Sequence, residues 1–281
     1  MEDLKKRAEV LIEALPYIRS FWGKKIVIKY GGSAMEDPSL RDEVLRDVLL
    51  LHYVGMKVVL VHGGGKEISE WMKRLGKEPV FVDGQRVTDE ESLEIAEMVL
   101  TGKTNKDLVA RLWKLGGKAV GISGKDAGFL IAKRKEGLGE VGEIERVDPH
   151  ILDVLMDDSY IPVISSIAMD EEGKGLNVNA DAAAGHIAGA INAEKLLILT
   201  DVRGVLERED DEESLISVIN FRELDGIIEK VGGGMKPKLL ACKIALLKGV
   251  RSAHIIDGRL PHSLLMEIFT DKGLGTMIVK D

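Results

Sequence analysis

Two short apolar segments each end in consecutive glycines and lead into a helical pattern, and this repeated arrangement constrains the fold more than any other feature. The first segment is residues 24–30, which precedes a glycine pair and a helix expected over about 38–53. The second is residues 58–62, which precedes three glycines and another helix. Apolar strands that alternate with helices form parallel sheets covered on both faces. The sequence therefore predicts an α/β fold.

The same alternation continues along the rest of the chain. Further strands are expected at 119–122, 161–164, 196–200 and 254–256, and helices at about 89–115, 150–156, 181–191 and 236–248. Residues 80–87 are interpreted as a hairpin, and residues 133–147 as a second, exposed hairpin that lacks a core. No low-complexity linker interrupts the chain, so any two lobes are expected to share one continuous sheet.

Residues 1–22 precede the first strand and carry apolar side chains at helical spacing. Pro16 lacks an amide hydrogen and is expected to divide this segment into two helical pieces. The sheet does not need the extension. Its apolar stripe therefore either contacts a partner or packs on the same chain, and the residues alone leave both alternatives open.

The bulk properties exclude several classes of protein. A chain of 281 residues can bury a sizeable core as one large domain or two lobes. A net charge of -8 argues against nucleic-acid or anionic-membrane partners. The single cysteine, Cys242, cannot form an intrachain disulfide or a cysteine-rich metal site. No apolar run is long enough to span a bilayer, and the N-terminus does not resemble a secretory signal, so a cytoplasmic location is expected.

Lys29 stands beside a glycine pair at the end of a predicted strand. Glycine lets backbone N–H groups approach an anion closely, and the lysine adds a positive charge, so the combination suits phosphate. Glycines are also common in ordinary turns, and the segment matches neither the P-loop nor the dinucleotide fingerprint. Similar turns at 63–65, 200–205 and 232–238 should meet at the same sheet edge, where α/β proteins bind ligands. Together they favour a phosphate-handling enzyme over an NAD(P)-linked oxidoreductase.

Three polar residues have two interpretations each from the sequence alone. Arg86 could bind a carboxylate through two hydrogen bonds or be an exposed surface residue. Asp181 could cap the helix that starts near it or belong to a polar site with Asn177. His62 has no second histidine or carboxylate at metal-binding spacing, so we interpret it as packed or bonded to its own turn and assign it no chemistry.

Six motifs, in this order, resemble those of the amino-acid kinase family, and the resemblance covers nearly the whole chain. They are IKYGGS at 28–33, VHGGG at 61–65, QRVT at 85–88, NVNAD at 177–181, TDVRGV at 200–205 and GGMKPK at 233–238. The resemblance implies an open αβα sandwich around a largely parallel central sheet shared by two lobes. Residues 23–192 would bind an acyl substrate, residues 193–281 would bind ATP, and residues 1–22 would serve oligomerisation or regulation.

Within that family, the motifs are most similar to those of members that phosphorylate the side-chain carboxylate of N-acetyl-L-glutamate. The reaction implied is transfer from ATP with Mg2+ to give N-acetyl-L-glutamyl 5-phosphate, the second step of arginine biosynthesis. Such a carboxylate is already ionised at pH 7, so alignment and charge neutralisation suffice without a general base.

The family pattern assigns a role to each matching residue. Lys29 and Lys238 would stabilise the phosphoryl group in transfer, and Asp181 would hold both lysines, while Lys236 would be a surface charge. The acyl substrate would contact Gly64, Gly65, Arg86 and Asn177. The nucleotide would contact Gly31, Gly32, Asp201, Val202, Arg203, Gly204, Val205, Leu206, Lys230, Gly233 and Met235. No residue is assigned as a metal ligand.

The N-terminal helix resembles that of arginine-inhibited members of the family, in which paired helices join dimers into a hexameric trimer of dimers. Tyr17, His254, Glu267 and Gly273 resemble the arginine-sensing positions, and Glu267 suits a cationic effector. The resemblance thus implies a homohexamer with feedback inhibition by L-arginine; a PII-type regulator is compatible but not indicated. The alternatives are a related kinase acting on N-acyl-aminoadipate, carbamate or a nucleoside monophosphate, and a non-catalytic arginine sensor.

Overall fold

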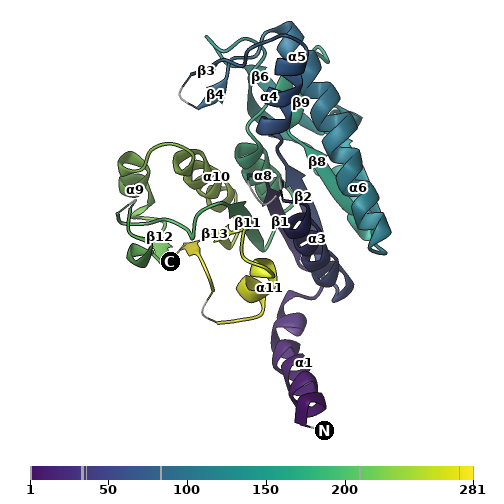
Figure 1. The fold of residues 1–281 in the computed structure, drawn as a ribbon, viewed down its shortest axis with the longest axis vertical. Coiled ribbons are helices and arrows are strands. Elements are labelled where there is room, and N and C mark those ends of the chain that lie inside the picture. The colour runs from purple at the N-terminus through teal and green to yellow at the C-terminus, as the bar shows by residue number, and fades with distance from the viewer. Residues whose placement is uncertain are drawn as a thin grey trace.

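The computed structural model describes residues 2–32, 35, 37–82, 84–208, 210–271 and 273–280, without the side chains of residues 2, 3, 6, 7 and 38 (Figure 1). Ser33 of the first glycine motif and Asp83 of the predicted hairpin lie outside the described residues.

The first half of the chain contains most of the helices and strands that the sequence predicts. In order they are α1 (Glu2–Phe21), β1 (Lys25–Tyr30), α3 (Pro38–Tyr53), β2 (Lys57–His62), α4 (Gly65–Arg74), β3 (Phe81–Val82), β4 (Gln85–Arg86), α5 (Glu90–Glu97), the π-helical segment η1 (Met98–Thr104), α6 (Asn105–Lys114), β5 (Ala119–Ser123), the 3-10 turn η2 (Asp126–Gly128), β6 (Leu130–Arg134) and β7 (Gly142–Val147).

The second half adds several short elements that the sequence analysis missed. The elements are α7 (His150–Asp157), β8 (Ile161–Ser165), β9 (Ile167–Met169), β10 (Gly175–Asn177), α8 (Ala180–Ala190), β11 (Lys195–Thr200), the 3-10 turn η3 (Glu212–Ser214), β12 (Val218–Asn220), α9 (Leu224–Lys230), α10 (Met235–Leu247), β13 (Ser252–Asp257), α11 (Ser263–Ile268) and β14 (Thr276–Val279). Strands β9, β10, β12 and β14 and helices α9 and α11 were not predicted.

One eight-stranded sheet runs through the part of the chain that the structure describes, in the order β12-β14-β13-β11-β1-β2-β8-β5. Every neighbouring pair is parallel except β13 and β14. Strand β1 lies between β11 and β2, so Lys29 pairs with Ile198 on one side and Val61 on the other. The expectation of a largely parallel, continuous sheet is confirmed.

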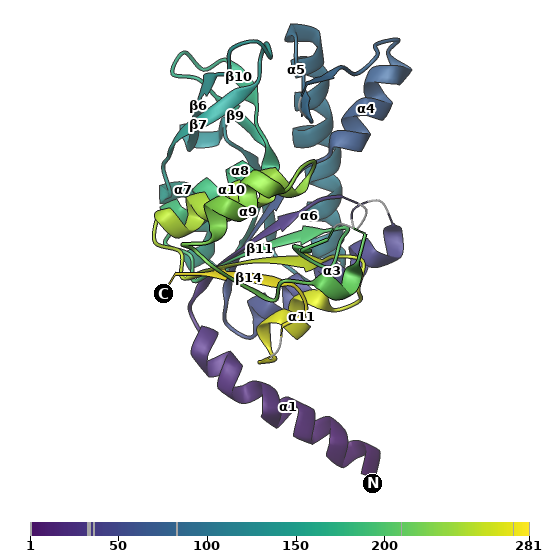
Figure 2. The same cartoon turned by 90° about the vertical axis from the view of Figure 1, so that its left-hand side faces the viewer.

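Helices cover both faces of this sheet (Figure 2). Along β1 the side chain of Val27 packs against the layer that contains α7, α8 and α10. Its neighbours Ile26 and Ile28 pack against the opposite layer, which contains α3, α6 and α11. Strands buried on both faces read as continuous apolar runs, which explains the sequence pattern. The open αβα sandwich is confirmed.

The segment 133–147, predicted to be an exposed hairpin, is part of a second sheet with the order β10-β9-β6-β7. The prediction that it lacks a core was wrong, since Leu138, Val141 and Ile144 are buried and Ile144 belongs to the main core cluster. A strand with one buried face alternates apolar and charged residues. The charged residues that flank Ile144 therefore hid its inward face from the sequence pattern.

Helix α1 projects away from the rest of the molecule (Figures 1 and 2) and is one continuous helix of 20 residues with Pro16 inside it. The expectation of two helical pieces was wrong. Proline removes one hydrogen bond, to the carbonyl four residues earlier, and in an exposed helix water can satisfy that carbonyl. Leu11 and Ile12 are 72% and 68% exposed, so no described residue covers this part of the apolar surface of α1, whereas Phe21 at its end packs on the core.

The helix predicted over 89–115 contains an unpredicted π-helical segment, η1, between α5 and α6. The hydroxyl of Thr101 donates to the carbonyl of Glu97, the acceptor that a regular α-helix offers to the Thr101 amide. None of the helices in the described residues is long and apolar enough to cross a membrane.

Candidate active site

Two lysines share the carboxylate of Asp181 at the boundary between the two halves of the sheet. The Nζ of Lys29, near the end of β1, lies 2.9 Å from Oδ1, and the Nζ of Lys238, in the first turn of α10, lies 3.1 Å from Oδ2. Asp181 is 5% exposed. Burial opposes its ionisation, but the charges of the two lysines outweigh burial and hold the pKa of Asp181 below its ordinary value. The cluster carries two positive charges and one negative charge.

Local geometry explains why glycine stands next to this cluster. A Cβ atom added to Gly31 would lie 2.8 Å from the Nζ of Lys29, so a side chain there would collide with the lysine. Gly32 has a φ of +69°, which favours glycine. The backbone thus favours glycine at Gly32, while Gly31 leaves room for the ammonium group of Lys29.

The alternative that Asp181 caps helix α8 was wrong. The cap is Asn179, whose side-chain oxygen accepts hydrogen bonds from the amides of Asp181 and Ala182. The carboxylate of Asp181 is thereby free to contact both lysines. Lys236, two residues before Lys238, is exposed. The two lysines of the GGMKPK motif therefore differ, because only Lys238 of the two contacts Asp181.

The four residues predicted to bind an acyl substrate all line one cavity of about 200 Å³. They are Gly64, Gly65, Arg86 and Asn177. Part of the remaining wall is apolar and consists of Ile68, Phe81, Leu100, Val141 and Val178. An adjoining cavity of about 360 Å³ is lined by Gly64, Gly65 and Arg86 as well as by Gly32 of the first glycine turn. The two cavities thus connect the acyl-site residues to the turn that follows Lys29.

Arg86 is buried, with 7% of its surface exposed, and no carboxylate of a described residue lies within ion-pair distance of its guanidinium. Its Nη2 donates to the carbonyl of Gly65 and to the hydroxyl of Ser69, both at 2.7 Å, and the group stacks on Phe81. Burial lowers the pKa of Arg86. A buried cation without an acidic partner is costly, and an anionic ligand would offset that cost.

The residues predicted to surround the nucleotide follow strands that are neighbours in the sheet or precede α10. Gly31 and Gly32 follow β1, and residues 201–206 follow β11. Lys230 ends α9, Gly233 lies in the turn after it, and Met235 begins α10. Val205 has a buried side chain, 1% exposed, that belongs to the main core cluster. Its side chain packs in the core beneath the turn instead of facing a ligand site.

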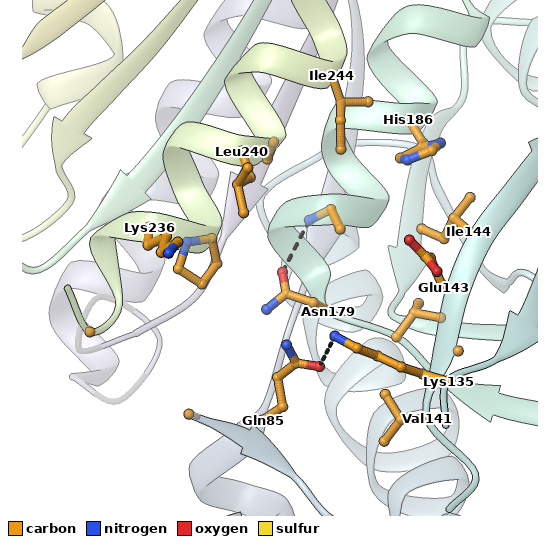
Figure 3. A pocket seen from close by; sticks show the side chains of 17 residues that line it. Gln85, Lys135, Val141, Glu143, Ile144, Asn179, His186, Lys236, Leu240 and Ile244 are labelled. Atoms are coloured by element: carbon orange, nitrogen blue, oxygen red, sulfur yellow. Dashed lines mark hydrogen bonds between the residues drawn. The ribbon is translucent and has the colours of Figure 1, made fainter. Parts of the chain in front are cut away.

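A groove of about 880 Å³ lies between α8, α10 and β7, and the sequence analysis did not predict it (Figure 3). It is lined by Lys236, Leu240 and Ile244 on one side and by His186 and Ile144 on the other (Figure 3). Gly84, Gln85, Val141, Val178 and Asn179 line both this groove and the cavity predicted to bind the acyl substrate, called the acyl cavity below. The acyl cavity therefore adjoins the groove.

The four predicted arginine-sensing positions lie in one region where α1 meets the C-terminal segment. The hydroxyl of Tyr17 donates to Asp271 at 2.6 Å, and His254 is 2.6 Å from the carboxylate of Glu267. A Cβ atom added to Gly273 would lie 3.1 Å from both carboxylate oxygens of Glu267.

Lys195 also belongs to this region, with its Nζ 2.9 Å from the Nε2 of His254. The sequence alone does not single out Lys195, because a lysine at the start of an apolar strand resembles an ordinary exposed lysine.

No group of three or more His, Cys, Asp or Glu side chains that could hold a metal ion occurs among the described residues. Asp181, the carboxylate of the lysine cluster, already contacts two ammonium groups.

Comparison with known proteins gives concordant results. The model of the amino acid kinase family matches residues 24–257. An acetylglutamate kinase from Pelotomaculum thermopropionicum is 53% identical over 290 residues, covering 98% of this chain and 98% of that protein.

Among solved structures, N-acetylglutamate synthase from Neisseria gonorrhoeae complexed with coenzyme A and N-acetyl-glutamate has a TM-score of 0.86 at 28% identity, covering 98% of this chain and 63% of that one. The same synthase complexed with coenzyme A and L-arginine has a TM-score of 0.82 at 26% identity, covering 98% and 65%. This chain thus spans less than two thirds of the synthase. A carbamate kinase from Giardia, at 16% identity and a TM-score of 0.70 over 92% of this chain and 99% of that one, shares the fold.

The family match covers most of the sequence, and the relative at 53% identity covers nearly all of it. The parallel sheet with its lysine and glycine turns agrees with both. The chain is therefore an enzyme that belongs to the amino acid kinase family.

Proposed function

We propose that this enzyme transfers the γ-phosphoryl group of ATP to the side-chain carboxylate of N-acetyl-L-glutamate, forming N-acetyl-L-glutamyl 5-phosphate in arginine biosynthesis. The observation that carries the proposal is the pair of lysines on one buried carboxylate, Lys29 and Lys238 on Asp181. A relative at 53% identity that is named acetylglutamate kinase supports the choice of substrate. The proposed location is the cytoplasm.

The proposed chemistry depends on positioning and charge. The attacking carboxylate needs no general base at pH 7, so its alignment with the γ-phosphorus is the main task. Lys29 and Lys238 contribute positive charge to the transferring phosphoryl group, while Asp181 keeps both ammonium groups in place before the nucleotide arrives. Preorganised charges of this kind need not rearrange during the reaction.

Arg86 is proposed to bind the carboxylate of the substrate that does not react. Its burial without an acidic partner among the described residues supports this role, since a carboxylate would neutralise the buried guanidinium. Gly64, Gly65 and Asn177, which line the same cavity, are proposed to contact the rest of the acyl substrate.

Residues 193–281 are proposed to bind ATP through the segments 201–206 and 230–235. Gly31 and Gly32 of the other lobe are proposed to contact the nucleotide as well. Residues 23–192 then form the acyl-substrate lobe. Mg2+ is proposed as the companion of the nucleotide, whose phosphate oxygens would supply ligands for it. When bound, it neutralises phosphate charge, and the two lysines supply the protein's share of that neutralisation.

We propose further that L-arginine inhibits the enzyme by binding where Tyr17, His254, Glu267 and Gly273 lie together, and that α1 joins dimers into a hexamer. The exposed apolar side chains of α1 and the contact between Tyr17 and Asp271 support this assignment. The synthase structure with L-arginine gives a precedent in a related chain.

The decisive experiment measures ADP release by the purified protein with ATP and Mg2+. N-acetyl-L-glutamate, N-acetyl-aminoadipate, carbamate and UMP are supplied in parallel, with and without L-arginine. The expected result is turnover of N-acetyl-L-glutamate at the highest kcat/KM. If another acceptor were preferred, that acceptor would replace N-acetyl-L-glutamate as the proposed substrate. If none were phosphorylated, the arginine-sensor alternative would be favoured.

A further inference from the structure

His62, at the end of β2, immediately precedes the three glycines that line the acyl cavity, and it is fully buried. Its Nδ1 lies 2.8 Å from the carbonyl oxygen of Gly63. Its Nε2 lies 3.1 Å from the Nδ2 of Asn105, the first residue of α6. The imidazole thus connects the glycine turn to the helix that follows the π-helical segment.

The partners of these groups determine which ring nitrogen carries the proton. The Nδ2 of Asn105 also donates to the carbonyl of Val163 at 2.9 Å, and its Oδ1 accepts from Lys106 at 3.2 Å. A carbonyl can only accept, so the amide nitrogen of Asn105 must face Val163 and therefore also faces the Nε2 of His62. Nε2 is then the acceptor, and the proton sits on Nδ1, which donates to Gly63.

The ring keeps this state over the ordinary pH range. Burial lowers the pKa of His62 to about 4, with a smaller lowering by Lys106 and an opposing effect of the bond to Gly63. The imidazole is therefore neutral near pH 7. A protonated Nε2 would put two donors, Nε2 and the Asn105 amide, against each other.

The bond to Gly63 acts on the peptide that the substrate meets. In a trans peptide the C=O and the N–H point to opposite sides, and the described residues contain no cis peptide bond. Holding the carbonyl of Gly63 therefore also sets the direction of the Gly64 amide. Gly64, the N-cap residue of helix α4, makes no side-chain capping bond, and both Gly64 and Gly65 line the acyl cavity. Consecutive glycines have more conformational freedom than other residues and need such a restraint.

We propose that His62, as its Nδ1–H tautomer held by Asn105, is a positioning residue that keeps the turn 63–65 in its substrate-binding conformation. Leu100 of η1 supports the same turn from the other side, since a Cβ atom added to Gly64 would lie 2.7 Å from its Cδ2. Leu100 of the π-helical segment thus lies beside the turn, whereas Asn105 at the start of α6 reaches the turn only through His62. The inference rests on the proposed acyl-substrate role of Gly64 and Gly65.

Two substitutions test the hydrogen bonds of His62 to Gly63 and to Asn105 one at a time. His62→Asn places an amide nitrogen near the position of Nδ1 and preserves the donor to Gly63, whereas His62→Gln places an amide near Nε2 and preserves only the contact with Asn105. Both remove the ring and one hydrogen bond, so their losses of thermal stability should be similar. The two variants therefore serve as matched controls for each other.

Steady-state kinetics should distinguish them. We expect His62→Gln to raise the KM for the acyl substrate about 10- to 100-fold while changing the KM for ATP little. His62→Asn should stay within about threefold of wild type for both. Equal effects of the two substitutions, or a change shared by the two substrates, would overturn the proposal.

A spectroscopic measurement tests the tautomer without any substrate. Nitrogen-15 NMR of histidine-labelled protein, with the resonance of His62 identified by its loss in His62→Gln, should show a protonated Nδ1 that does not titrate between about pH 5.5 and 8. A protonated Nε2 would overturn the inference. If wild-type protein did not phosphorylate N-acetyl-L-glutamate, the proposed function would fail, whereas the tautomer would still be decided by this measurement.

Discussion

The ammonium group of Lys29 lies 2.9 Å from the carboxylate of Asp181, which ties the end of strand β1 to the start of helix α8. Both side chains are buried, with 9% and 7% of their surfaces exposed. Because Lys238 contacts the second oxygen of the same carboxylate, one negative charge positions two positive charges. This excess of positive charge is what an incoming phosphoryl group requires.

Lys238→Met should lower kcat about 100- to 1000-fold, the usual loss when one charge-stabilising donor is removed, with a smaller change in KM. Lys29→Met should behave in the same way. Lys236→Met is the matched control, since Lys236 is exposed and lies in the same turn of α10, and it should retain near wild-type kcat. Steady-state kinetics measure kcat for the three variants. If Lys236→Met lost more kcat than Lys238→Met, the charge-stabilising role would belong to Lys236.

Asp181→Asn should reduce kcat at least about 100-fold, because two lysines lose the charge that positions them. The free energy of unfolding should fall by only about 1–3 kcal/mol, because Asn179 still caps α8. Kinetics and urea unfolding measure the two effects. Asp225→Asn, which removes an exposed ion pair with Lys243, should change neither by much.

The pH dependence of the Asp181 contribution has a defined sign. Its pKa in the folded protein is lowered, so its contribution to stability is present above the unfolded value of about 3.8 and is lost only as the pH falls through the lower folded value. The difference in unfolding free energy between wild type and Asp181→Asn should therefore be constant from about pH 5 to 8. A difference that varied across that range would show that Asp181 is not ionised in the folded protein.

Arg86→Met should raise the KM for the acyl substrate roughly 10- to 100-fold and leave the melting temperature nearly unchanged. The stability is expected to hold because the guanidinium is buried without an acidic partner among the described residues, so its removal also removes a desolvation cost. Arg86→Lys keeps the charge but not the hydrogen bonds of Nη2 to Gly65 and Ser69 that fix the guanidinium. It should also raise KM, and a wild-type KM in Arg86→Lys would show that a positive charge alone suffices at this position.

The pair between His262 and Asp47 links the segment before α11 to helix α3 at a distance of 2.7 Å. The hydrogen bond to Asp47 raises the pKa of His262, with a further rise from Glu43 and an opposing effect of Arg46. Burial raises the pKa of Asp47 to about 6. A group whose folded pKa is raised contributes stability at low pH and loses it as the pH rises through the folded value, so both groups act in the same direction.

Stability should therefore decline as the pH rises from about 5 to 8, and His262→Gln should flatten that decline. Because the side chain of His262 is half exposed, the effect should be at most about 1 kcal/mol, or about 2–4 °C in melting temperature. Differential scanning fluorimetry across this range checks it. His150→Gln, at the exposed start of α7, is the control and should leave the slope unchanged.

Deleting residues 1–20 should preserve kcat while reducing both the response to L-arginine and the fraction of hexamer. Tyr17→Phe is a finer test, because it removes only the hydroxyl that donates to Asp271. It should weaken inhibition by arginine without changing assembly. Analytical ultracentrifugation and inhibition curves measure the two effects, and an unchanged arginine response in the deletion would refute the regulatory proposal.

Much of the fold was predictable because its determinants are local. The strand at 25–30 and the helix at 38–53 follow from apolar runs, glycine turns and a proline at the helix start, all of which are visible in short windows. The buried face of β7 and the π-helical segment were not predictable in this way. A half-buried strand with charged neighbours resembles an exposed hairpin, and a widened helical turn has no distinct pattern.

For the site, the amino-acid sequence by itself determined which residue types stand at the glycine turns and that these turns follow parallel strands. Only the tertiary structure decided that Asn179, not Asp181, caps α8, that Arg86 is buried without an acidic partner in the described part of the chain, and that His62 meets Asn105. The physical reason is that capping, desolvation and proton position depend on partners far away in sequence. Those partners exist only after the sheet and its helices have assembled.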